Sequence, residues 1–124
     1  MKMKILCLGN EFVKEDSFAK KIGEELLKEG FEVININDSF QLMGILNEET
    51  DFIILDVVLG LSDPRIINVS ELTDTKIMTA HDFDASFVLK LFENKEIRII
   101  GIPMNGEISK IIIDVKKMVD LYSG

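Results

Sequence analysis

Residues 52–58, with the sequence FIILDVV, decide the fold class of this chain. Apart from Asp56, every position in the segment is apolar, so both faces of the strand that it predicts would be buried. Two further segments have a similar character: residues 2–8, which precede a Gly-Asn pair, and residues 97–102, which precede a proline. Strands that are apolar on both faces are typical of a parallel sheet with helices on each side.

Helical patterns separate the predicted strands. Residues 17–28 place apolar side chains along one stripe and are followed by Gly30, which favours a helix end. The alternation of strands and helices predicts an α/β fold, a three-layer α/β/α sandwich with a mainly parallel sheet, in a single domain over residues 1–124. In detail, we expect helices over residues 17–28, 39–47 (with Ser39 as its cap), 82–92 and 107–121, and further strands over residues 31–36, 65–69 and 76–79, the last two being candidates for a hairpin.

The composition excludes several kinds of partner. The 124 residues include 14 basic and 22 acidic side chains, for a net charge of −8 and with no basic run, so we expect no binding to nucleic acid or to an anionic membrane. No apolar stretch approaches the ~20 residues that cross a bilayer, so we expect no membrane insertion. The apolar run after Lys4 is short, so we expect no secretory signal. A single cysteine cannot form an internal disulfide, which favours the reducing cytoplasm.

Three polar side chains stand out near the ends of predicted strands. Ligands of parallel sheets bind beyond the carboxyl ends of the strands, where the strand order reverses. Asp16 follows the first strand, Asp56 lies near the end of the third, and His81, the only histidine, follows residues 76–79. Two carboxylates and one imidazole form a mixed oxygen and nitrogen ligand set that suits a divalent ion such as nickel or zinc. We therefore expect these three residues to be metal ligands at one edge of the sheet.

Each of the three residues also has a structural alternative. Asp56 could accept hydrogen bonds from loop amides, because a buried carboxylate is costly unless it is paired. Asp16 could stabilise a helix N-terminus, and His81 could be a solvated residue at the start of a helix. The sequence contains no motif for an independent nucleophile, a nucleotide or a dithiol centre, so the catalytic residues stay unassigned. The one thiol, Cys7, is expected to be a small core residue.

Residues 55–60, LDVVLG, resemble the phospho-acceptor strand of response-regulator receiver domains, and residues 78–81, MTAH, resemble their switch strand. In a receiver, Asp56 would be the phospho-acceptor. The first strand, however, ends in Gly-Asn where a receiver has the paired acids that hold magnesium, and Ile102 stands where a receiver has a lysine. Without these groups phosphoryl transfer loses its electrostatic stabilisation. The receiver domain is therefore the alternative interpretation.

A second resemblance extends over nearly the whole chain. Residues 6–19, LCLGNEFVKEDSFA, are similar to the opening strand, Gly-Asn pair, acidic pair and helix of the hydrogenase maturation endopeptidases, which trim the C-terminal tail of the nickel-iron hydrogenase large subunit. Residues 53–56, IILD, resemble the strand of that family that ends in an aspartate ligand. Residues 81–89, HDFDASFVL, resemble its histidine at the start of a helix, and residues 99–103, IIGIP, resemble its closing segment.

The resemblance implies that Asp16, Asp56 and His81 bind nickel, the same three positions that the strand ends indicate. It implies an endopeptidase of the aspartyl type that removes the C-terminal extension of a nickel-loaded hydrogenase large-subunit precursor. The nickel would be carried by the substrate, and zinc or cadmium could occupy the site as a surrogate. The ion would either polarise the peptide or a water molecule, or only dock the substrate. We expect a monomer. The other alternative is a non-catalytic protein that binds nickel or a hydrogenase subunit.

Overall fold

The computed structural model describes residues 4–8, 14–36, 38–48, 51–58, 60–68, 90, 92, 97–103 and 106–123, with the backbone alone for residues 14–20, 122 and 123. The strands are β1 (Lys4–Leu8), β2 (Glu32–Ile36), β3 (Phe52–Val57), β4 (Arg65–Ile67) and β5 (Arg98–Ile102). The helices are α1 (Lys14–Lys28), α2 (Ser39–Glu48) and α5 (Ile108–Ser123). Every one of these elements overlaps a strand or helix that the sequence predicts.

The described strands form one five-stranded sheet in the order β2-β1-β3-β5-β4. Strands β2, β1, β3 and β5 run parallel to one another, and β4 runs antiparallel to β5. The central strand β3 lies between β1 and β5, so Leu55 is flanked by Cys7 and Ile100. All six residues of β3 are buried, because neighbouring strands satisfy its backbone on both sides and helices cover both faces. The predicted mainly parallel sheet is confirmed.

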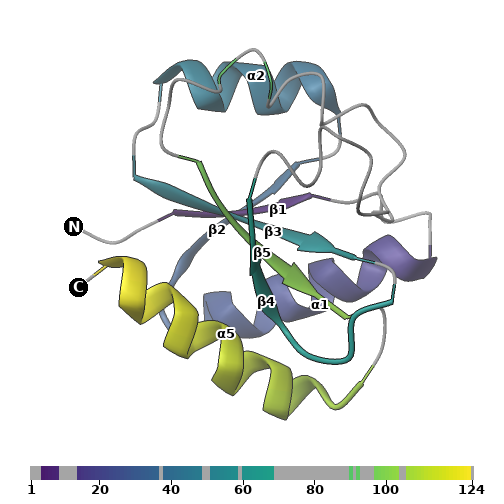
Figure 1. The fold of residues 1–124 in the computed structure, drawn as a ribbon. Helices are drawn as coiled ribbons and strands as arrows, with labels where there is room; N and C mark the ends of the chain where they lie inside the picture. Colours follow the sequence, from purple (N-terminus) through teal and green to yellow (C-terminus); the bar gives the residue numbers. More distant parts are fainter. Residues whose placement is uncertain are drawn as a thin grey trace.

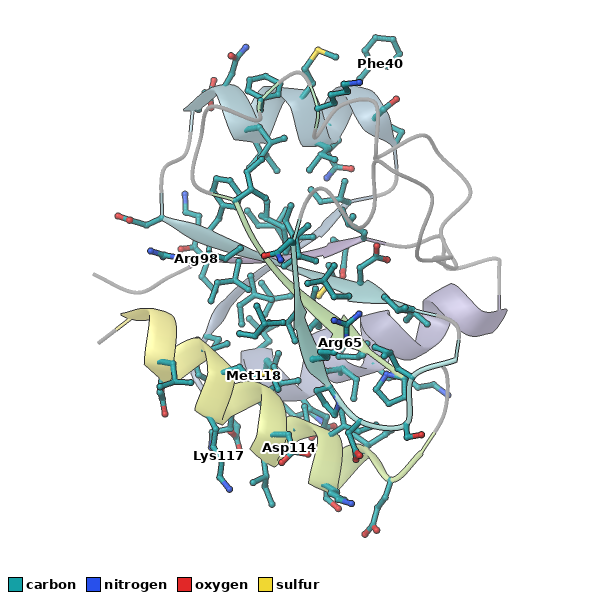
Figure 2. The ribbon with its side chains drawn as sticks, in the orientation of Figure 1. Phe40, Arg65, Arg98, Asp114, Lys117 and Met118 are labelled. Atoms are coloured by element: carbon teal, nitrogen blue, oxygen red, sulfur yellow. The ribbon has the colours of Figure 1, made fainter. Side chains whose placement is uncertain are left out.

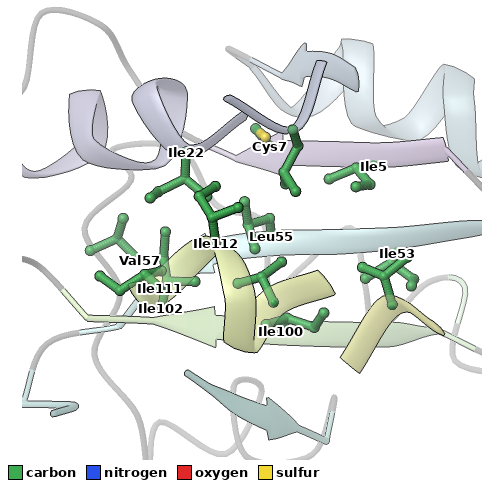
Figure 3. Close-up of a cluster of buried hydrophobic side chains, with 13 residues drawn as sticks. Ile5, Cys7, Ile22, Ile53, Leu55, Val57, Ile100, Ile102, Ile111 and Ile112 are labelled. Carbon is green, nitrogen blue, oxygen red and sulfur yellow. The ribbon is translucent and has the colours of Figure 1, made fainter. Parts of the chain in front are cut away.

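Helices cover both faces of this sheet (Figure 1). On one face, α1 and α5 enclose a cluster of buried side chains that includes Ile53, Leu55 and Val57 of β3 (Figure 3). On the other face, α2 covers a second cluster that includes Phe52 and Ile54. The two clusters alternate along β3 because successive side chains of a strand point to opposite faces. This arrangement is the three-layer α/β/α sandwich expected from the sequence.

The outer helices present one apolar and one polar side. On α5, Met118 packs against the first cluster, whereas Lys117 is exposed (Figure 2). Nζ of Lys116 on α5 lies 2.5 Å from Oε2 of Glu29. This ion pair connects α5 to Glu29, the residue that follows α1. On α2, Phe40 is 84% exposed and points away from the sheet (Figure 2). None of the described helices is both long enough and apolar enough to span a bilayer.

Helix α1 ends where the sequence predicts. Gly30 has a φ of 97°, a conformation that glycine adopts without steric cost. Its N–H donates a hydrogen bond to the carbonyl of Leu27, and the N–H of Phe31 donates one to the carbonyl of Leu26. This pair of hydrogen bonds is a Schellman motif, which satisfies two carbonyl groups of the last helical turn. The helix stop predicted at Gly30 is confirmed.

Helix α2 is capped one residue earlier than predicted. The Oδ1 atom of Asp38 accepts a hydrogen bond of 2.8 Å from the N–H of Gln41, and the carbonyl of Asp38 accepts one from the N–H of Leu42. Asp38 is therefore the N-cap, and the prediction that Ser39 caps this helix is wrong. Aspartate and serine are equally good caps, so their order in the sequence does not decide which one takes the position.

Other boundaries differ from the prediction by a few residues. Helix α1 begins at Lys14, three residues before the predicted start, and β4 ends at Ile67. The described partner of β4 is β5. The predicted hairpin strand at residues 76–79 and most of the predicted helix at residues 82–92 lie outside the described residues.

Both ends of the described chain lie at the same edge of the sheet. Lys4 begins β1 at the amino edge of the parallel strands. Helix α5 follows β5 and leads back towards that edge (Figure 1). The carboxyl ends of the parallel strands are at the opposite edge.

Candidate functional site

The carboxyl ends of β1 and β3 form the point where the strand order reverses. From β1 the chain passes through α1 to β2, which lies on one side of β1. From β2 it passes through α2 to β3, which lies on the other side of β1. Helices α1 and α2 cover opposite faces of the sheet. The connection through α1 and the connection through α2 therefore run in opposite directions across the sheet. Ligands of open α/β sheets bind at such a point.

Asp56 lies at this edge, as the penultimate residue of β3. Among the side chains that the structure describes, it is the one charged group with 0% exposure. Its neighbours on the same face, Ile54 and Val58, belong to the cluster under α2, so Asp56 faces the α2 side of the sheet. Its Oδ2 atom is buried and accepts no hydrogen bond within the described part of the chain, while the residue takes part in other interactions. A fully buried charged side chain at the edge where ligands of such sheets bind makes Asp56 the strongest candidate site residue.

The backbone of Asp16 lies at the same edge. Five residues, 9–13, connect Leu8 at the end of β1 to Lys14 at the start of α1. Asp16 is the third residue of α1, and α1 starts near the ends of β1 and β3 (Figure 1). The structure therefore brings the backbone of Asp16 and the side chain of Asp56 to one edge, with α1 on one face and the Asp56 carboxylate on the other.

His81 lies outside the described residues, so its convergence with the two aspartates stays a prediction. Within the described side chains, no group of three histidine, cysteine, aspartate or glutamate residues could hold a metal ion. The described side chains include that of Asp56 but neither His81 nor the side chain of Asp16. The predicted ligand set therefore stands as a prediction.

Sequence analysis did not single out two residues on the α2 side of the sheet, Gly101 and Ile67. Gly101 of β5 is the register partner of Asp56. A Cβ on Gly101 would overlap the Cδ1 atom of Ile67 from β4. The sequence did carry a signal, because a glycine within the apolar strand at residues 98–102 indicates a close approach of another part of the chain. The partner in that approach is not predictable from local sequence.

Cys7 belongs to the core and not to the site. Its side chain is buried in the cluster beneath α1 and α5, and this burial raises the pKa of its thiol from 9.0 to about 12. Metal binding requires the thiolate, which is disfavoured here. The prediction that Cys7 is a small core residue is confirmed.

The comparison with known proteins finds sequence similarity to a curated protein but no matching family. No model of a known protein family matches the sequence. Protein FrxA from Pyrococcus furiosus is 30% identical over 101 residues, which span 71% of this chain and 74% of FrxA.

Three solved structures are similar to this chain over most of its length. The [NiFe] hydrogenase maturation protease HybD from Thermococcus kodakarensis has a TM-score of 0.65 and 22% identity, covering 96% of this chain and 99% of that one. A hydrogenase 3 maturation protease has a TM-score of 0.69 and 20% identity, with coverage of 94% and 88%. The hydrogenase maturating endopeptidase HybD from E. coli has a TM-score of 0.63 and 14% identity, with coverage of 96% and 90%. At these identities the similarity shows a shared fold.

Proposed function

The chain belongs to the family of protein FrxA and has the fold of the hydrogenase maturation proteases, and we propose that it is itself such a protease. The predicted resemblance to the hydrogenase maturation endopeptidases is confirmed for the fold. The proposed reaction is hydrolysis of one peptide bond, which frees the C-terminal extension of a nickel-loaded hydrogenase large-subunit precursor. The observation that carries the proposal is the buried carboxylate of Asp56 at the edge of the sheet where the strand order reverses.

In this proposal the nickel ion belongs to the substrate. The precursor presents the ion, and Asp16, Asp56 and His81 complete its coordination. Two oxygen ligands and one nitrogen ligand suit a divalent ion of intermediate softness, and zinc or cadmium would serve as a surrogate. The ion acts as a Lewis acid on the scissile peptide or serves to dock the substrate. In both cases the protein would act only on precursors that already hold the metal.

The burial of Asp56 bears on how a substrate would reach it. With 0% exposure, the carboxylate becomes accessible only when neighbouring chain at the carboxyl edge moves aside. We propose that docking of the precursor causes this opening. The burial then also keeps solvent ions away from the carboxylate until the substrate is bound.

The test is to incubate the purified protein with a nickel-loaded large-subunit precursor and to measure the mass of the product. The expected result is the loss of one C-terminal peptide. The same precursor without nickel is the control, and it should stay intact. Intact nickel-loaded precursor that forms a stable complex with the protein would instead assign a binding function without cleavage.

A phosphorylation assay examines the receiver alternative. Acetyl phosphate and magnesium would place an acid-labile phosphoryl group on Asp56 if the chain were a receiver. The proposed protease should remain unphosphorylated. We further expect the protein to act as a monomer in the cytoplasm, which size-exclusion chromatography with light scattering and cell fractionation would examine.

A further inference from the structure

Asp56 and Gly101 are partners in the register of β3 and β5. Parallel partners on adjacent strands lie about 5 Å apart and point to the same face. Ile99 belongs to the cluster under α2, so alternation along β5 places Gly101 on that face as well. The space beside the Asp56 carboxylate is thus the space that a side chain at position 101 would occupy.

One side chain from β4 and one from the residue that follows β3 fill that space. A Cβ on Gly101 would overlap Cδ1 of Ile67, and it would lie 3.2 Å from Cγ1 of Ile67 and 3.0 Å from Cγ2 of Val58. Ile67 is 1% exposed and Val58 is 2% exposed, and both are β-branched residues with restricted rotamers. Neither has room to move aside without disturbing its neighbours, because protein cores are closely packed.

Backbone conformation does not explain the glycine. The positive-φ glycines of the described chain are Gly30, Gly60 and Gly106, and Gly101 is not among them. A glycine within a strand costs stability relative to alanine. Its presence at this position is therefore explained by space: it lets the side chain of Ile67 lie over β5, on the face of the sheet that Asp56 also occupies.

We infer that Gly101 is a positioning residue for Asp56, because its missing side chain lets Ile67 and Val58 form an apolar wall that holds the carboxylate in one orientation at the carboxyl edge. The role of this orientation in precursor cleavage rests on the proposed function. The wall itself rests on the close approach of Ile67 and Val58 to Gly101 and on the register of Gly101 with Asp56. A methyl group at position 101 would push the wall apart and enter the space next to the carboxylate.

The test compares Gly101→Ala with a matched control, Gly23→Ala. A Cβ on Gly23 would lie 2.8 Å from Sγ of Cys7 and 3.2 Å from Cγ1 of Val33, so this variant also overpacks the core. Its contacts are with the cluster on the other face of the sheet. Both variants are compared at equal folded fraction, which is measured by circular dichroism.

Two readouts are needed. The first is the ¹³C chemical shift of the Asp56 carboxyl group, assigned with Asp56→Asn, which requires no substrate. The second is kcat/KM for tail removal from the nickel-loaded precursor. We expect Gly101→Ala to move the Asp56 signal and to lower kcat/KM by roughly tenfold or more, as is usual when a residue that supports a metal ligand is changed. Gly23→Ala should leave both close to the wild type.

A second variant keeps the comparison possible if Gly101→Ala folds poorly. Ile67→Val removes the Cδ1 atom that the new methyl group would overlap, so Gly101→Ala with Ile67→Val should fold and should regain part of the lost kcat/KM. Equal effects of Gly101→Ala and Gly23→Ala on both readouts, or no effect of either, would overturn the inference. If the wild type cleaves no precursor while the Asp56 signal moves in Gly101→Ala alone, the proposed function is wrong and the positioning of Asp56 by Gly101 is supported.

Discussion

The Sγ atom of Cys7 on β1 lies 2.8 Å from the point that a Cβ on Gly23 of α1 would occupy. The helix and the strand therefore meet where there is no room for a methyl group. We expect Gly23→Ala to lower the free energy of unfolding by about 1–3 kcal/mol, because overpacking a core outweighs the better helix propensity of alanine. Urea denaturation followed by circular dichroism measures this change.

A double-mutant cycle isolates the contact. Cys7→Ala removes the Sγ atom, so Gly23→Ala in that background meets mainly Cγ1 of Val33, at 3.2 Å. Its cost should then fall by at least about 1 kcal/mol, because most of the overpacking is removed, whereas the helix-propensity gain of alanine is the same in both backgrounds. The same cost in both backgrounds would show that Cys7 is not the obstacle.

Stability should decline in alkaline solution because of Cys7. Burial raises the pKa of its thiol to about 12 from 9.0, so above pH 9 the unfolded chain has lost this proton while the folded chain keeps it. The unfolded state then binds fewer protons, and stability falls as pH rises from 9 towards 12. The thiol should contribute a loss of roughly 1.4 kcal/mol at pH 10.

Cys7→Ala is the control for this pH effect, because other groups also titrate in the range. The difference in unfolding free energy between the wild type and Cys7→Ala should decrease between pH 8 and pH 10. The native thiol should also react far more slowly with a disulfide reagent at pH 8 than the urea-unfolded thiol does, since the thiolate is the reactive form. Equal reaction rates would mean that the thiol is accessible in the folded protein.

Substitution of His81 tests the predicted ligand set. We expect His81→Ala to abolish precursor processing without unfolding the domain, because the metal would lose its one nitrogen ligand. Mass spectrometry of the precursor and the circular dichroism spectrum are the two measurements. Unimpaired tail removal by this variant would discard His81 as a ligand.

Asp56→Asn tests whether the buried carboxylate is functional or structural. The amide has nearly the same shape but no charge, so metal coordination and processing should be lost. The amide also keeps one acceptor oxygen, so the free energy of unfolding should fall by no more than about 1–2 kcal/mol. A loss of several kcal/mol in stability would assign Asp56 to structural hydrogen bonding instead.

The ion pair between Lys116 and Glu29 should contribute little to stability. Its side chains are 39% and 42% exposed, so solvent and salt screen the attraction. A double-mutant cycle with Lys116→Met and Glu29→Gln should give a coupling of about 0.3–1 kcal/mol that decreases at high salt. The more exposed pair of Lys28 and Glu25, at 73% and 45%, is the comparison and should couple more weakly.

The parallel part of the fold was predictable because its signal is local. Residues 52–58 are apolar on both faces, and such a strand is stable only inside a covered sheet. Gly30 ends its helix as predicted, because the left-handed conformation needed there favours glycine. Ser39 and Asp38 show the limit of this reasoning, since two good caps in succession leave the choice to the surrounding structure.

The site was predictable in part for the same reason. Asp56 stands out because a single charge interrupts an apolar segment, and the structure confirms its burial. The pairing of β4 with β5 was not predictable, because β4 has three residues and its place depends on the contact between Ile67 and Gly101. Contacts between distant segments leave little trace in the local pattern of either one.

The common position of the two chain ends matters for the design of experiments. Lys4 and the end of α5 lie at the edge of the sheet opposite Asp56 (Figure 1). An affinity tag, a fluorophore or a solid support attached to either terminus would therefore leave the carboxyl edge open to a large incoming subunit.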